Sequence, residues 1–546
     1  MSAITHSPIR SAHPGAWIGA RGRLWRASMA LIALLVALPI VLVLSAWLQP
    51  QPEVWGHLAD TVLVELLRNT VLLMLGVGLG VVIVGVGLAW LTVMYEFPGR
   101  SFFEWALVLP LAMPAYVLAF VAVGLLDFSG PLQTSLRVLF GAEGFWFPPI
   151  RSPGGVIAVL TLAFYPYVYM LARAAFQSQG HAVLESGRVL GLSAWGAFRR
   201  VALPMARPAI AAGTALALME TLADFGAVTV FNYDTFTTAI YKAWFGLFNL
   251  PAAAQLASLL LLFVGVALYA ERRARGQARY HAGNRRGREA RYRLKGWRAA
   301  TACGVAATVL GVAFVLPVGQ LLVWAVRVVG QDLDSRYFGF LLHTVTLGAA
   351  AALITVTIGL LIAYVRRTWS SPFTRALAQF ATLGYALPGS VLAVGAMLLF
   401  VWLEGLFSTG AGVVLGGGLV ALLFAYTVRF LAVSYGPLDS ALERIKPSIA
   451  LAARSLGASQ REVMWRVYLP MLRPGLLSAA LLVLVEVMKE MPATLLLRPF
   501  GWDTLALRIF EMTSEGEWER AALPALTLVL AGLLPVILLM RRSAAR

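Results

Sequence analysis

Residues 200–208 read RVALPMARP, and residues 466–474 read RVYLPMLRP. The two stretches differ only at their third and seventh positions, and each leads into a long apolar run. A glycine precedes each stretch at the same distance, Gly191 in the first case and Gly457 in the second. Such a match between distant parts of one chain is typical of an internal structural repeat. We therefore expect two halves with the same fold.

Further pairs of segments match in the same order along the chain and support this duplication. Each half contains six apolar runs, and because six is an even number the two halves insert in the same direction. Parallel halves predict a pseudo-two-fold axis along the membrane normal, with a path between the halves. The matching segments are Asn69-Thr70 with His343-Thr344, and MPAYVLA around Pro114 with LPGSVLA around Pro388.

The composition is that of a membrane protein. Of the 546 residues, 60% are hydrophobic and 13% charged, and the mean hydropathy is +0.78. A helix crosses a bilayer with about 20 apolar residues. We therefore predict an all-α integral membrane protein with twelve transmembrane helices, the first of them uncleaved because it is too long for a signal peptide. The predicted spans are 27–48, 70–95, 103–126, 154–175, 208–230, 253–271, 299–325, 344–365, 376–403, 414–435, 475–497 and 521–540.

The distribution of positive charge predicts the orientation. Most of the 44 Lys and Arg residues lie before the first span, in loops that follow even-numbered spans, or after the last span. By the positive-inside rule, both termini are then cytoplasmic. The densest basic run, 272–298, is expected to be a cytoplasmic linker that touches anionic lipid rather than nucleic acid. The predicted domains are a first repeat 1–271, this linker, and a second repeat 299–546.

Two matched cytoplasmic segments, 185–204 and 451–470, carry the most specific pattern. Glycine can adopt positive φ at no steric cost, so Gly191 and Gly457 can each turn the chain between two short helices. Proline lacks an N–H group, so we expect Pro204 and Pro470 to end the second short helix of each segment. Each segment is thus predicted to form a helical projection from the membrane.

The spacing resembles that of the EAA loop of ABC importer permeases, in which the loop docks on an ATPase subunit. The second copy lacks the acidic residue, because Leu451 stands in its place. The alternative is an amphipathic loop that lies on the lipid headgroups. By resemblance, the residues that couple to the ATPase are Glu185, Gly191, Leu203, Pro204, Ala453, Gly457, Leu469 and Pro470.

No catalytic or nucleotide-binding motif is present in the sequence. A P-loop ends in Gly-Lys-Ser/Thr, and none of the four lysines follows a glycine. We therefore expect a permease subunit that is not an enzyme and holds no cofactor. The resemblance to importer permeases implies that ATP and Mg are bound by two copies of a partner ABC ATPase in the cytoplasm.

Several ionisable residues lie within predicted spans, where they are costly and often functional. The segment LMETLADFGAVTVF contains Glu220 and Asp224, and LVEVMKEMPATLLL contains Glu486, Lys489 and Glu490. Each carboxylate pair has i,i+4 spacing, which places both members on one helical face. Lys489 can pair with Glu486. These residues are predicted to line a translocation path, with transient metal contact by Asp224 and Glu490; the alternative is a structural role in hydrogen bonding.

The segments around these charges resemble the fused double permease of iron(III) ABC importers, a type I importer permease fold. They are METLADFGAVTVF, DTFTTAIYKAWFG and EVMKEMPATLLLRPFGWDTLALRIFEM. The resemblance implies a bacterial inner-membrane protein that receives iron(III) from a periplasmic binding protein. Permeases for thiamine or 2-aminoethylphosphonate have the same architecture and stay open as alternatives. A secondary transporter driven by an ion gradient is an alternative of another class.

Overall fold

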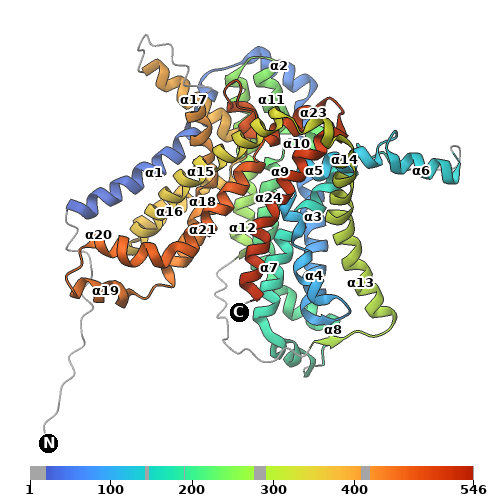
Figure 1. Cartoon of the computed structure of the whole chain (residues 1–546), viewed down its shortest axis with the longest axis horizontal. Helices are drawn as coiled ribbons and strands as arrows, with labels where there is room; N and C mark the ends of the chain where they lie inside the picture. Colours follow the sequence, from blue (N-terminus) through green and yellow to red (C-terminus); the bar gives the residue numbers. More distant parts are fainter. Residues whose placement is uncertain (1–19, 142–146, 190, 276–290, 407–417, 545–546) are drawn as a thin grey trace, which may run out of the picture.

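The computed structural model describes residues 20–141, 147–189, 191–275, 291–406 and 418–544. Within these ranges, eleven helices are long and apolar enough to span a membrane, or twelve if one bent pair of helices counts as a span. The fold is an all-α bundle (Figure 1), as predicted. Its only described strands are the two-residue segments β1 (Tyr95–Glu96) and β2 (Tyr292–Arg293).

The helices before the basic linker lie in the following order. They are α1 (Ala20–Ser45), η1 (Ala46–Leu48), α2 (Pro52–Thr61), α3 (Leu63–Met94), α4 (Arg100–Ala106), η2 (Leu109–Ala112), α5 (Ala115–Leu126), α6 (Pro131–Phe140), α7 (Pro153–Val189), α8 (Ala194–Ala197), η3 (Phe198–Ala202), α9 (Leu203–Ala223), α10 (Gly226–Val230), α11 (Phe236–Phe245) and α12 (Leu250–Arg275).

The second half repeats this order with small differences. Its helices are α13 (Trp297–Leu310), η4 (Gly311–Val315), α14 (Leu316–Asp332), α15 (Ser335–Thr368), α16 (Pro372–Ala381), η5 (Leu383–Ala386), α17 (Gly389–Leu406), α18 (Leu419–Glu443), α19 (Pro447–Ser455), α20 (Gln460–Glu462), η6 (Val463–Tyr468), α21 (Leu469–Lys489), α22 (Pro492–Leu497), α23 (Leu505–Ser514) and α24 (Trp518–Ala544).

Several of the predicted spans are interrupted rather than continuous, and two of them break at a matched proline. The run 103–126 is divided among α4, η2 and α5, and the run 376–403 among α16, η5 and α17. In the second case the helices on either side of the break are bent by 111°. Pro114 and Pro388 lie at the two breaks. Each proline lacks an N–H group and restricts the preceding residue, which disfavours a continuous helix there.

The core of each half is built from equivalent helices. α3 packs against α7 and α9, and α15 packs in the same way against α18 and α21. The first span of each half crosses to the other half. α1 packs against α16 and α17, whereas α13 contacts α4, α14 contacts α5, and η4 contacts η2 and α7. The two halves are therefore interlocked.

The end of the basic linker is attached to the first half. β2 pairs in parallel with β1, with Tyr292 beside Tyr95 and Arg293 beside Glu96. The Leu294 N–H donates to the Glu96 carbonyl oxygen at 3.0 Å. This pairing holds the linker beside the end of α3. The linker residues 276–290 lie outside the described part of the chain.

Figure 1 places the two repeated glycine segments at the same end of the bundle, at α8 in one half and at α19 and α20 in the other. α2, α11 and α23 lie at the opposite end. This agrees with parallel halves.

Candidate translocation site

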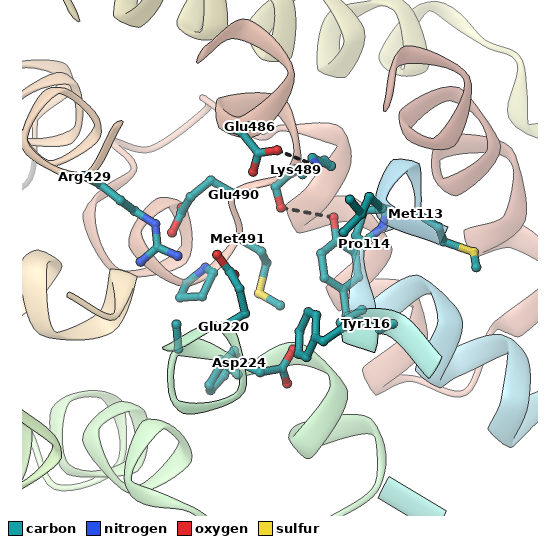
Figure 2. A pocket seen from close by; sticks show the side chains of 18 of the residues that line it. Met113, Pro114, Tyr116, Glu220, Asp224, Arg429, Glu486, Lys489, Glu490 and Met491 are labelled. Carbon is teal, nitrogen blue, oxygen red and sulfur yellow. Dashed lines mark hydrogen bonds and ion pairs between the residues drawn. The ribbon is translucent and has the colours of Figure 1, made fainter. Parts of the chain in front are cut away.

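A cavity of about 120 Å³ lies between the two halves, beside the ends of α9 and α21. Figure 2 shows Glu220, Glu490 and the Arg429 guanidinium pointing into the same space. All five residues predicted for the path line it, so the fold brings them together. The polar lining residues are Tyr116, Tyr167, Glu220, Asp224, Tyr385, Arg429, Glu486, Lys489 and Glu490.

Asp224 lies where α9 ends, and its backbone is extended there (φ −68°, ψ 130°). Its Oδ1 accepts a hydrogen bond from the Val228 N–H at 3.1 Å, so the carboxylate caps the short helix α10. Its carbonyl oxygen accepts from the Thr237 hydroxyl at 2.7 Å. A carboxylate is favourable at this position because the first N–H groups of a helix have no partner within the helix.

Glu490 repeats this arrangement at the end of α21. Its Oε1 accepts from the Ala493 N–H and its Oε2 from the Thr494 N–H, both at 3.1 Å, so it caps α22. The side chain is buried. The prediction that each pair shares one helical face is wrong at its second member, because the helix ends at Asp224 and at Glu490. The helix is interrupted at each of these residues, and the carboxylate accepts hydrogen bonds from backbone N–H groups of the helix that follows.

The first members of the two pairs remain inside α9 and α21 and have side-chain partners. The Tyr385 hydroxyl donates to Glu220 Oε1 at 3.0 Å. Lys489 Nζ donates to Glu486 Oε1 at 2.8 Å, which confirms the predicted pairing. Tyr116 donates to the Lys489 carbonyl oxygen at 3.5 Å, and both interactions of Lys489 are drawn in Figure 2.

Arg429 on α18 is a site residue that sequence reasoning missed. Its Nη1 donates to the carbonyl oxygen of Leu387, which lies in the break between η5 and α17, at 2.8 Å. Its buried Nε has no hydrogen-bond partner among the described residues. The missed signal was an arginine within an apolar run, LLFAYTVRFLAV. An ionisable residue at bilayer depth is by default a candidate functional residue.

The two halves touch directly beside this cavity. A Cβ atom added to Gly226 would lie 2.5 Å from Met491 Cε and 2.6 Å from Tyr116 Cβ, so only glycine fits there. Next to it, the ring of Phe225 packs on Phe510 of α23, with centroids 5.5 Å apart. Apolar side chains such as Met491 and Phe225 therefore fill the space between the break after α9 and the break after α21.

The carboxylates do not form a built metal centre. Across the described ranges, no group of three or more His, Cys, Asp or Glu side chains is arranged to hold a metal ion. Two of the four carboxylates are instead occupied by helix capping. Metal contact by Asp224 and Glu490 therefore stays a prediction, and any such contact would compete with the capping hydrogen bonds.

The glycines of the two repeated segments adopt the predicted left-handed conformation, with φ of 84° at Gly191 and 88° at Gly457. In the second half the glycine separates two short helices, α19 and α20, as predicted. In the first half the preceding helix is the long α7, which contains Glu185. The side chain of Glu185 lies outside the described residues.

The prolines do not end a short helix, contrary to expectation. Leu203 and Pro204 begin α9, which continues without a break from the π-helical turn η3, and Leu469 and Pro470 begin α21 after η6 in the same way. A proline in a helix removes one hydrogen bond and its ring crowds the preceding turn. The wider π turn accommodates both effects, so the helix runs on into the bundle.

The second segment exposes apolar surface at the end of the bundle. α19 has no buried residue, and Leu451, Leu456 and Trp465 are largely exposed. Ala453 is partly buried and packs against the core beneath. In the first segment Trp195 is exposed. Exposed apolar groups of this kind are typical of a protein contact surface.

Comparison of the sequence with known protein families identifies the family of this chain. The family model for the binding-protein-dependent transport system inner membrane component matches the chain twice, over residues 76–276 and 355–546. The chain belongs to this family. The two matches confirm the internal duplication, and they show that this membrane permease is a double version of the family unit.

Individual relatives agree with the family assignment. The chain is 30% identical to an Fe(3+)-transport system permease protein of Haemophilus influenzae, over 87% of this chain and 89% of that protein. It is 23% identical to the ferric transport system permease protein of Actinobacillus pleuropneumoniae, over 75% of this chain and 61% of that protein. The sulfate transport system permease protein of Escherichia coli is 24% identical over 43% of this chain and 84% of its own length.

Proposed function

We propose that this permease is the transmembrane subunit of an ATP-driven importer that carries iron(III). The observation that supports the proposal best is the small cavity between the halves, beside the matched ends of α9 and α21. Its lining includes four carboxyl groups and two cationic side chains. The relative with 30% identity is an Fe(3+)-transport permease.

The chemistry of the cavity favours a small, highly charged cation. Hard cations prefer oxygen ligands such as carboxylates. A volume of about 120 Å³ is below the roughly 300–1,000 Å³ of typical pockets for organic ligands, which disfavours thiamine. Because the described carboxylates form no metal cluster, the ion would be passed along rather than held, as a transporter requires.

The partners follow from the same proposal. Two copies of a cytoplasmic ABC ATPase would dock at the segments around Gly191 and Gly457, where exposed apolar side chains gather. ATP and Mg would be bound in those chains, and this subunit would perform no catalysis. A periplasmic iron(III)-binding protein would deliver the ion at the end formed by α2, α11 and α23. The protein would then lie in the bacterial inner membrane with both termini in the cytoplasm.

The transport step would be alternating access. Each ligand must favour one state energetically in order to shift the equilibrium. ATP would do so through the two glycine segments, and the loaded binding protein through the opposite end. The two halves meet at Gly226 and Met491, so their reorientation would open or close the space around the carboxylates.

The test compares charge removal with cap removal in the reconstituted complex. Asp224→Asn together with Glu490→Gln removes both charges but leaves one oxygen acceptor at each position. The hydrogen bond from Val228 and one of the two from the first turn of α22 can therefore persist. We expect ATP-dependent uptake of radioactive iron to fall at least about tenfold with unchanged binding-protein docking. Alanine at both positions would in addition lower thermal stability, because a lost cap costs about 0.5–2 kcal/mol. Unchanged uptake in the Asn/Gln variant would make the two carboxylates purely structural.

An oxyanion is the second candidate cargo, and one observation favours it. Arg429 and Lys489 place two cations at the cavity, and the buried Nε of Arg429 has no hydrogen-bond partner among the described atoms. Guanidinium groups suit phosphonate or sulfate oxygens, which would fit a 2-aminoethylphosphonate importer. Uptake of labelled phosphonate, with no uptake of iron, by the same complex would favour this reading. Uptake of either cargo without ATP would instead indicate a secondary transporter.

A further inference from the structure

A second, larger cavity lies away from the translocation site, on the flank of the bundle. Its volume is about 690 Å³, and α3 and α13 form its walls. Its floor is core, since Leu88 and Ala302 are buried, whereas Ile83 and Trp297 at its edges are largely exposed. Its lining residues include Ile83, Gly87, Leu88, Tyr95, Trp297 and Arg298. We call this cavity the flank groove.

The flank groove has the length of one lipid leaflet. It extends along α3 from Ile83 to Tyr95 at the helix end. At about 1.5 Å per helical residue this distance is roughly 18 Å. Half of a hydrocarbon core of about 30 Å is roughly 15 Å. The apolar part of the groove therefore matches the depth reached by an acyl chain from one side of the membrane.

The polar and basic residues of the groove lie at one of its ends, whereas the rest of its lining is apolar. Tyr95, Trp297 and Arg298 lie at that end, and the Arg298 guanidinium stands 5.7 Å from the centroid of the Trp297 ring. Lys295 is exposed beside them. Tryptophan and tyrosine prefer the membrane interface. This end thus has the composition of a headgroup region with a positive charge.

Among the described residues, the acidic side chain next to this end is already paired. Glu96 follows Tyr95 directly, but its carboxylate accepts an ion pair from Arg100 Nε at 3.1 Å. No carboxylate lines the described walls of the groove. The pairing of β2 with β1 is what holds the basic residues at this place, because it fixes the linker beside the end of α3.

We propose that the flank groove binds one anionic phospholipid. An acyl chain lies between α3 and α13, and the phosphate is bound by Arg298 and Lys295, with Trp297 at the level of the headgroup. The leaflet is the one on the side of the glycine segments. Basic residues near a membrane surface attract anionic lipid, and basic pockets between spans bind such headgroups. The lipid would join the linker to the first half.

The first test measures retained lipid by native mass spectrometry of the full-length protein in detergent. The probes are phosphatidylglycerol and, as the zwitterionic comparison, phosphatidylcholine. We expect the wild type to retain phosphatidylglycerol preferentially and Arg298→Gln with Lys295→Gln to lower this retention by about fivefold for each charge. The control pair Arg272→Gln and Arg273→Gln removes two exposed charges at the end of α12 and should leave retention unchanged.

A second pair of variants tests the apolar part. Gly87 lines the groove and a Cβ added there would meet nothing within 4 Å, so Gly87→Leu places a bulky side chain in the groove. It should abolish retention of both lipids, whereas Gly265→Leu on α12, where the space is equally open, should not. Three results would each overturn the proposal. The first is an equal loss of lipid retention in the variant Arg272→Gln with Arg273→Gln, and the second is a loss of retention with Gly87→Leu but not with Arg298→Gln and Lys295→Gln. The third is a wild type that shows no preference for phosphatidylglycerol.

Discussion

At the scale of single residues, Gly389 leaves space for the Glu490 carboxylate because it has no side chain. A Cβ added to Gly389 would lie 2.3 Å from Glu490 Oε1 and 3.3 Å from Arg429 Nη1. Because both oxygens of Glu490 are held by the first turn of α22, the carboxylate cannot move without losing a hydrogen bond. We therefore predict that Gly389→Ala reduces iron uptake by the reconstituted complex at least about tenfold and lowers its melting temperature.

The control for this prediction is Gly405→Ala on the same helix. A Cβ there would meet nothing within 4 Å, so alanine should be neutral or slightly stabilising. Wild-type uptake by the Gly389→Ala variant would show that the position of the Glu490 carboxylate does not matter for transport.

The sequence predicted which carboxylates enter the cavity but not how they are held. The repeat identified Glu220, Asp224, Glu486 and Glu490 as matched residues, and all four line it. Helical periodicity could not reveal that two of them lie at helix ends, because the apolar run continues through both breaks. Arg429 has no charged counterpart in the first half, so the comparison of the repeats passed over it.

At the scale of elements, the left-handed glycines decide the shape of the two repeated glycine segments. Proline requires φ near −65°, which conflicts with φ of 84° at Gly191 and 88° at Gly457. We predict that Gly191→Pro combined with Gly457→Pro abolishes co-purification of the partner ATPase. Insertion of the helices should persist, because the spans themselves are unchanged, and protease protection in membrane vesicles would measure it.

A matched double variant at the other end of the bundle separates the docking role from general strain. Gly501 and Gly516 also have positive φ, 79° and 80°, and equally open surroundings. Gly501→Pro with Gly516→Pro should retain the ATPase. If the Gly191 and Gly457 variant also retained it, the segments would not be the docking site.

Proline also shows why element ends were hard to predict. Pro204 and Pro470 have the spacing of helix terminators, yet each lies two residues after the end of a π-helical turn in a continuous helix. Pro114 and Pro388 do interrupt helices. Whether a proline interrupts its helix depends on whether the preceding turn can widen. This depends on packing and cannot be predicted from the local sequence.

At the scale of the whole molecule, the halves are joined by crossing helices as well as by the linker. α1 contributes Met29 and Val36 to a core cluster whose other members, such as Ile362, Ala378 and Leu392, belong to the second half. A Cβ added to Gly395 would lie 2.8 Å from the Pro39 carbonyl oxygen, so α1 and α17 are in close contact. Sequence alone indicated two repeats but carried no signal for this exchange of first spans.

The interlocked architecture predicts that the linker is dispensable for assembly. We expect residues 1–280 and 281–546, expressed as two chains in one cell, to co-purify and to transport iron with the partner subunits, because α1 remains buried against the second half and α13 to η4 against the first. Gly395→Leu in the second chain should sharply lower recovery of the complex, since the side chain would meet the backbone at Pro39, whereas Gly405→Leu should not. Failure of the unmodified chains to co-purify would show that the covalent linker, rather than the crossing helices, holds the halves together.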